Sequence, residues 1–163
     1  MNRLVPLTLV LTGVVASGSA VAASQSLDPK VFSSIRSETI EFKPFPAFPQ
    51  GARLAVVVGD PKAAGLYVVR VSVPDGVKLM PHVHPEDRIY TVISGVFYIG
   101  YGTVFDPAKL VAYGPGSVVV LPANTPHFHW ARSGTYVTQV SGTGPLGLRY
   151  LDPADDPRTQ QAK

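Results

Sequence analysis

The stretch that decides the fold is "PHVHPEDRIYTVISG", Pro81–Gly95. It holds two histidines two residues apart, His82 and His84, then an acidic pair, then an apolar run of the kind that forms a β-strand. Side chains two apart on a strand point to the same face, so both imidazoles can be aimed at one place. The stretch therefore predicts either a strand with a metal site or a polar turn that happens to contain histidine.

The same histidine spacing occurs once more in the sequence. The 163-residue chain has four histidines, and the other two are His127 and His129. Two strands that cross inside a barrel can bring such pairs together. Imidazole is a common ligand of Fe, Mn, Zn, Ni and Cu, and three such ligands leave positions open for water or substrate. We therefore predict a divalent transition metal as cofactor, with exposed or internally satisfied histidines as the alternative.

The chain from residue 53 to residue 151 consists of short runs of β-branched and aromatic residues. Gly, Pro, Asp and Asn, which favour turns, separate these runs. Seven or more short strands at this spacing predict an all-β sandwich or barrel. The exception is "FDPAKL", Phe105–Leu110, for which we expect one helical turn. The length of the chain fits one domain with one core.

Both ends of the sequence differ from this central part. Residues 1–22 have the layout of a secretory signal peptide, with an early positive charge, an apolar run and a closing Ala-Val-Ala. An uncleaved membrane anchor is the alternative. We expect cleavage, and hence a periplasmic or secreted protein without membrane contact. Residues 23–52 are expected to form an N-terminal arm, and residues 152–163 a flexible polar tail.

The composition excludes several classes of protein. The net charge is only +3, from 14 Lys and Arg against 11 Asp and Glu, and no basic run occurs, so no nucleic-acid partner is expected. The chain has no cysteine, which excludes thiolate metal ligands and thiol catalysis. Although export would permit disulfides, the fold must be stabilised by packing alone.

The two histidine pairs lie in motifs that resemble those of the cupin superfamily. The family's first motif is Gly, five residues, His-x-His, three or four residues, Glu, six residues and Gly. The corresponding positions here are Gly76, His82, His84, Arg88 and Gly95. The second motif is Gly, five residues, Pro-x-Gly, two residues, His, three residues and Asn. The corresponding positions here are Gly116, Pro122, Asn124, His127 and Ala131.

The resemblance implies a fold and an assembly. The fold would be a double-stranded β-helix, or jelly-roll, barrel over residues 53–151. Many cupins are dimers, so a homodimer is expected. The sequence also departs from the family at three positions. Asn124 is a mild change because Asn tolerates the left-handed backbone, whereas Ala131 removes a polar side chain.

The third departure, Arg88, has the largest consequence because it stands where cupins have a metal-binding Glu. A guanidinium cannot ligate a cation. Two like unit charges about 4 Å apart repel by about 4 kcal/mol at an effective dielectric near 20. Another group must therefore offset the charge of Arg88 if a metal is bound.

Three arrangements would do so. In the first, the three histidines at the family's ligand positions hold the metal and Arg88 pairs with Glu86 or Asp87, which fits the all-histidine triads of the family's thiol and diketone dioxygenases. In the second, Glu86 or His129 supplies a further ligand. In the third, the metal site is degenerate and Arg88 binds an anionic ligand. The candidate metal ligands are thus His82, His84, His127, Glu86 and His129.

Strand parity gives two further predictions. Tyr90 should share a face with the first histidine pair, either as a pocket wall or proton donor, or as a buried Tyr whose hydroxyl meets a backbone carbonyl. Phe128 and Trp130 alternate with the second pair and should point out of the barrel. Exposed aromatic rings need a cover. The candidates are the "PFPAF" part of the arm, residues 44–48, or a second subunit.

These observations lead to a functional hypothesis. We expect an exported cupin that binds a metal and a small organic molecule, including anionic ones. The chemistry implied by the resemblance is dioxygenase-like, with Arg88 and Tyr90 as the candidate catalytic residues that orient the substrate. The alternative is a non-catalytic module that binds or senses a small ligand and has a degenerate metal site.

Overall fold

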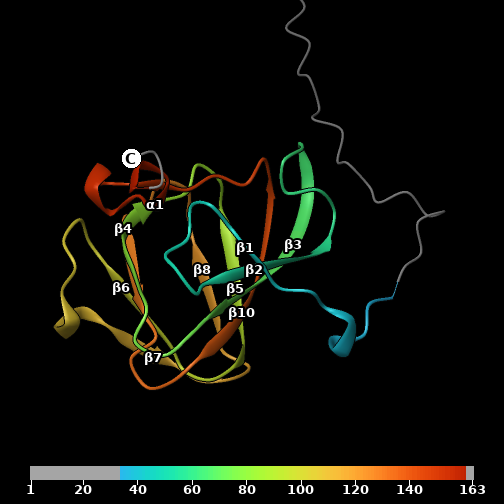
Figure 1. Ribbon diagram of the computed structural model, residues 1–163, viewed down its shortest axis with the longest axis horizontal. Coiled ribbons are helices and arrows are strands. Elements are labelled where there is room, and N and C mark those ends of the chain that lie inside the picture. Colours follow the sequence, from blue (N-terminus) through green and yellow to red (C-terminus); the bar gives the residue numbers. More distant parts are fainter. Residues whose placement is uncertain (1–33, 161–163) are drawn as a thin grey trace, which may run out of the picture.

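The structure is a computed structural model and describes residues 34–160 (Figure 1). The expected signal peptide and the first part of the arm lie outside these residues. Almost all regular structure in the described chain is β, in two antiparallel sheets that enclose one core. The prediction of an all-β jelly-roll barrel is confirmed. Within residues 34–160, no helix has the length and apolar character that crossing a membrane requires.

The larger sheet has six strands in the order β1-β2-β3-β10-β5-β8. Along β3 and β10, buried residues alternate with more exposed ones, as expected where one face of a sheet covers the core. The bounds of the six strands are β1 Lys43–Pro44, β2 Arg53–Val58, β3 Gly65–Val73, β5 Arg88–Ser94, β8 Val118–Leu121 and β10 Tyr136–Gly144.

The smaller sheet has five strands in the order β11-β4-β9-β6-β7. It carries three of the four histidines, and the fourth, His84, directly follows β4. In the pairing of β4 with β9, His82 lies opposite His127. The bounds of the five strands are β4 Lys78–Val83, β6 Phe97–Tyr101, β7 Val111–Tyr113, β9 His127–Trp130 and β11 Arg149–Tyr150.

Short helical turns connect or follow the strands. The expected turn in Phe105–Leu110 is confirmed by a 3-10 helix, η2, at Pro107–Lys109, where the Asp106 carboxylate accepts from the Ala108 N–H at 2.9 Å. Residues 152–160 belong to the segment that the sequence predicts to be a flexible tail. They contain two further helical turns, and the Arg158 side chain donates to the Leu148 carbonyl at 3.1 Å. The other helical elements are η1 Ser37–Thr39, η3 Pro153–Asp155 and α1 Pro157–Gln160.

The core lies between the two sheets and also includes part of the arm. Its fully buried side chains include Tyr67, Phe97 and Tyr136, and burying a large apolar side chain stabilises the fold by about 1.5–3 kcal/mol. Phe48 of the arm packs in the same cluster. The arm is therefore attached to the barrel through both β1 and an apolar anchor.

The cover over Phe128 and Trp130 differs from the sequence prediction. The Phe105 ring lies 5.0 Å from the Phe128 ring and 6.2 Å from the Trp130 ring, measured between centroids. Phe105 comes from the connection between β6 and β7. The arm, one of the two candidates for this cover, does not supply it, because its Phe48 packs in the core instead. Phe128 is fully buried beneath this connection.

Candidate metal centre

Three histidines meet inside the barrel. His82 on β4 and His127 and His129 on β9 each place one ring nitrogen within 4.8 Å of the others. All three side chains are buried, with His82 and His127 fully so. The ring centroids of His82 and His127 are 4.2 Å apart. The two histidine pairs, distant in the sequence, thus converge on one place inside the barrel.

Backbone carbonyls orient two of these rings. The Nδ1 of His82 lies 2.7 Å from the Met80 carbonyl oxygen, and the Nδ1 of His127 lies 2.9 Å from that of Thr125. A carbonyl oxygen only accepts, so Nδ1 carries the proton and donates in both rings. Each Nε2 is consequently left with a free lone pair, the form in which imidazole binds a metal.

The Nε2 atoms of the three clustered histidines have no hydrogen-bond partner among the residues that the structure describes. The Nε2 atoms of His82, His127 and His129 are buried and without a hydrogen bond, and within residues 34–160 the one other such side-chain atom is the Trp130 Nε1. Leaving a buried polar atom unpaired costs about 1–3 kcal/mol. Three of them at one point indicate that a further group belongs there.

A divalent transition metal fits this arrangement. Imidazole nitrogens bind such an ion at about 2.0–2.1 Å, so nitrogens that share an ion lie within roughly 4 Å of each other. The three ring nitrogens lie within 4.8 Å of one another, which is close to that limit. Small rotations of the rings would bring all three nitrogens within binding distance of one ion. A single ion would satisfy all three Nε2 atoms.

Burial keeps the rings neutral. It lowers the pKa of His82 and of His129 well below the ordinary value, and it lowers the pKa of His127 to about 4. The positive charge of Arg88 acts in the same direction on all three rings. Because a metal binds the neutral imidazole, the centre is ready for an ion at neutral pH.

His84 lies beside this group but is engaged elsewhere. Its Nδ1 donates to the Gly147 carbonyl oxygen at 2.7 Å, and its Nε2 accepts from the Tyr90 hydroxyl at 3.3 Å. Its ring centroid is 5.0 Å from those of two cluster histidines. The structure therefore groups His129, rather than His84, with the other two. The triad taken from the family motif was His82, His84 and His127.

Arg88 is neutralised by Glu86, as in the first of the three arrangements. Its Nε donates to the Glu86 Oε1 at 2.9 Å, its Nη2 donates to the same oxygen, and Nη2 also donates to the Gly147 carbonyl at 2.8 Å. The two side chains are only 6% and 10% exposed. The Glu86 carboxylate also accepts from the Tyr67 hydroxyl at 2.9 Å. Glu86 is thus occupied by this network and stands outside the three-nitrogen group.

Tyr90 points into the barrel, as strand parity predicts, and is 3% exposed. Its hydroxyl meets the His84 imidazole, a side-chain partner in place of the backbone carbonyl considered from the sequence. Burial raises the pKa of Tyr90, while the nearby Arg88 charge acts to lower it. The hydroxyl therefore stays protonated at neutral pH and can donate.

Two residues of this network carry no motif in the sequence. Tyr67 is one of several aromatic residues on the strands, and only its inward parity on β3 marks it. Gly147 lies in the connection before β11, and it holds both His84 and Arg88 through its carbonyl oxygen. A backbone contact of this kind depends on tertiary structure, so the sequence offers no signal for it.

The space left around the centre is small. An inner cavity of about 20 Å³ lies between the sheets and is lined by His82, His84, His129, Arg88 and Tyr90 together with apolar side chains. A cavity needs roughly 10–15 Å³ to hold one water molecule. The cavity therefore has room for one small ligand of a bound ion, such as a water molecule, but not for an organic molecule.

The sequence and the structure of this chain give different results when they are compared with known proteins. No known family profile matches the sequence, and no curated protein does. The polyketide cyclase RemF from Streptomyces resistomycificus superposes with a TM-score of 0.65 at 15% identity, over 81% of this chain and 94% of that one. An RmlC-like cupin protein from Ralstonia eutropha gives 0.57 at 20% identity, over 80% of this chain and 82% of that one.

A third similar structure is a sugar phosphate isomerase from a cupin superfamily, from Silicibacter pomeroyi. Its TM-score is 0.56 at 18% identity, over 74% of this chain and 82% of that one. Identities this low show the fold alone. The shared fold covers most of each chain.

Proposed function

Because this chain has the cupin fold, we propose that it binds a divalent transition metal through His82, His127 and His129 and acts on a small organic molecule. The observation that carries the proposal is the set of three buried Nε2 atoms without partners. Proteins of similar structure include a polyketide cyclase, DMSP lyases and a sugar phosphate isomerase. These names support a small molecule as the substrate.

The bound metal would supply Lewis-acid activation of the substrate or bring it together with dioxygen, and dioxygenase-like chemistry is the version we propose. The protein's contribution is to hold three neutral imidazoles in a dry cavity. Tyr90 is the residue that we propose to donate a proton, because its buried hydroxyl is protonated and already engaged in a hydrogen bond with His84.

Arg88 receives a different role from the one expected on sequence alone. Its Nε and Nη2 are committed to Glu86 and Gly147. We therefore propose that Arg88 is a positioning residue, which fixes the segment whose carbonyl orients His84. Its positive charge is paired with Glu86, and this offsets part of the repulsion that an unpaired guanidinium would exert on a metal ion.

The alternative of a non-catalytic binding or sensing module is favoured by one observation. The inner cavity of about 20 Å³ does not accommodate an organic molecule beside the metal. A protein that only binds a metal and a small ligand needs no larger space. Substrate-dependent turnover would exclude this alternative.

Elemental analysis and oxygen uptake test the proposal. Protein purified without a histidine tag should contain close to one ion per chain, and His82→Ala and His127→Ala should lose it. Oxygen consumption is then measured against a panel of small acids, enols and thiols. Metal without turnover supports the non-catalytic module. A wild-type protein that binds none of Fe, Mn, Zn, Ni and Cu contradicts the proposal.

We also propose that the protein is exported to the periplasm or secreted, and that it forms a homodimer. The pattern of residues 1–22 supports export, and the resemblance to cupins supports the dimer. Mass spectrometry of protein from the periplasm and medium should show a mature chain that begins near Ala23. Light scattering should give twice the mass of one chain.

A further inference from the structure

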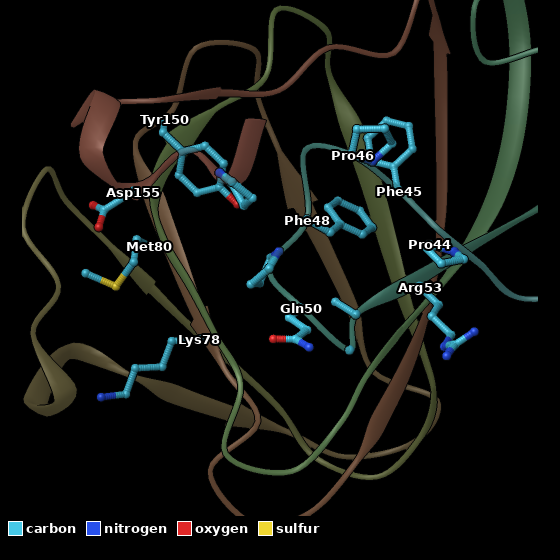
Figure 2. A pocket seen from close by; sticks show the side chains of 14 residues that line it. Pro44, Phe45, Pro46, Phe48, Gln50, Arg53, Lys78, Met80, Tyr150 and Asp155 are labelled. Atoms are coloured by element: carbon cyan, nitrogen blue, oxygen red, sulfur yellow. The ribbon is translucent and has the colours of Figure 1, made fainter. Parts of the chain in front are cut away.

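A larger hollow lies next to the metal cavity. A cleft of about 810 Å³ opens between the arm, β4 and the C-terminal turns (Figure 2). Figure 2 shows Phe48 in the middle of this cleft, with Met80 and Tyr150 on one side and Phe45 and Pro46 on the other. The cleft is therefore walled largely by aromatic, proline and methionine side chains.

Phe48 separates the two spaces. Of the described residues, it alone lines both the outer cleft and the inner cavity. Its side chain is 9% exposed and belongs to the apolar cluster that closes the inner cavity together with Leu79 and Val71. The Phe48 ring thus lies between the outer cleft and the cavity at the histidines.

The outer cleft and the inner cavity differ in the size of the molecule that each can hold. Pockets for small organic ligands measure about 300–1,000 Å³, and the outer cleft of about 810 Å³ is in this range. The inner cavity, at about 20 Å³, has room for roughly one water molecule. An organic molecule can therefore occupy the cleft, where Phe48 lies between it and the cavity at the histidines.

The turn that carries Phe48 is fastened at few points. The Phe48 N–H donates to the Phe45 carbonyl at 2.9 Å, and the two rings meet edge to face at 4.9 Å. The Tyr150 hydroxyl donates to the Ala47 carbonyl at 2.9 Å. Tyr150 lies on β11, opposite His82 of β4, so this side-chain bond ties the turn to the sheet that carries His82.

We propose that Phe48 is a specificity-determining residue, which controls passage from the outer cleft to the histidine centre and limits the size of the molecule that reaches it. This inference rests on the proposed function, since it assumes a metal at the three histidines. The charged side chains that line the cleft are Arg53, Lys78 and Asp155, two positive and one negative. The cleft therefore favours a small organic acid with an apolar or aromatic body.

Ligand-binding kinetics of the Co²⁺-loaded protein test the inference without reference to turnover. The visible spectrum of Co²⁺ reports a new ligand, and stopped-flow mixing with azide or benzoate gives the rate for a small and a large anion. Phe48→Ala should raise the benzoate rate by about tenfold or more, because a closed site binds only through a minor open state. The azide rate should rise much less.

Further variants separate access from general loosening. Phe48→Leu should give an intermediate benzoate rate, and it preserves an apolar anchor if Phe48→Ala folds poorly. Tyr150→Phe removes the bond to Ala47 and should raise the benzoate rate in the same direction. Phe105→Ala is the matched control, because it deletes the same kind of ring and lines neither space. The Phe105 ring lies 5.0 Å from the Lys78 ammonium, so any change in the charge of the cleft would alter the rates of both anions alike and leave their ratio unchanged.

Each outcome has a definite meaning. A benzoate-to-azide rate ratio that rises in the Phe48 variants and stays unchanged in Phe105→Ala supports the inference. Equal acceleration of both anions, or the same ratio in all variants with Co²⁺ bound, overturns it and leaves the proposed function standing. Failure of the wild-type protein to bind Co²⁺ at the histidines overturns both.

Discussion

His82 and His127 face each other across β4 and β9, and each donates its Nδ1–H to the carbonyl of the residue two positions before it. The two hydrogen bonds turn both Nε2 atoms toward the same point. The backbone of each strand therefore orients its own ligand, without help from an acidic side chain. The proposed metal centre therefore has oriented ligands although Arg88 stands where the cupin motif has Glu.

The first prediction concerns which histidines bind the ion. His129→Ala should lower the affinity for Co²⁺ by more than about 100-fold, because it removes one of three converging nitrogens. His84→Ala should lower it by only about 10- to 100-fold, as is typical of a residue beside the ligands. Titration calorimetry measures both. A larger loss in His84→Ala than in His129→Ala would show that the family's usual triad binds the ion instead.

The second prediction concerns the buried ion pair. Glu86→Ala leaves the Arg88 guanidinium buried without its carboxylate and should lower the free energy of unfolding by about 3–5 kcal/mol. The double change Glu86→Ala/Arg88→Met removes both charges and should restore much of this loss. Urea unfolding measures the two variants. If Glu86→Ala lowers the free energy of unfolding by less than about 1 kcal/mol, the value typical of an exposed ion pair, the buried network is refuted.

The third prediction concerns pH. In the metal-free protein burial lowers the pKa of His127 to about 4, whereas in the unfolded chain the ordinary value is 6.5. Between these values the unfolded chain binds a proton that the folded chain does not, so stability falls as the pH is lowered from 6.5 toward 4. Burial lowers the pKa of His82 and His129 in the same sense. Thermal unfolding of chelator-treated protein should show a falling Tm across this window, and a constant Tm would argue against buried neutral imidazoles.

The fourth prediction concerns the cover over the outer aromatic rings. Trp130 is the one tryptophan of the chain, and its emission reports its surroundings. Phe105→Ala should uncover it and shift the emission to longer wavelength. Phe45→Ala, in the arm, should leave the emission unchanged. A shift of the emission in Phe45→Ala, with none in Phe105→Ala, would show that the arm covers Trp130 instead.

Some of this architecture could be predicted because it depends on spacing along one strand. The gaps around the two His-x-His units fix which residues face inward, so the convergence of the histidines follows from parity once the strands form a barrel. An acidic partner of Arg88 could also be named in advance, as Glu86 or Asp87, because both precede it closely in the sequence. Which of the two pairs with it depends on the bend before β5.

Other features depend on contacts between distant segments and could not be predicted. The hydrogen bonds of His84 to Tyr90 and to the carbonyl of Gly147, which belong to different elements, are contacts of this kind. The connection that carries Phe105 has no periodic pattern to show which face of the barrel it covers. The position of Phe48 between the outer cleft and the inner cavity follows from the way the arm folds back, and its Pro and Phe composition does not specify this.

X-ray absorption spectroscopy of the Co²⁺-loaded wild-type protein shows directly whether the histidines bind an ion. We expect one ion per chain with three imidazole nitrogens around it, at about 2.0–2.1 Å. A shell made of oxygen ligands without imidazole, or a protein that takes up no Co²⁺, would contradict this expectation.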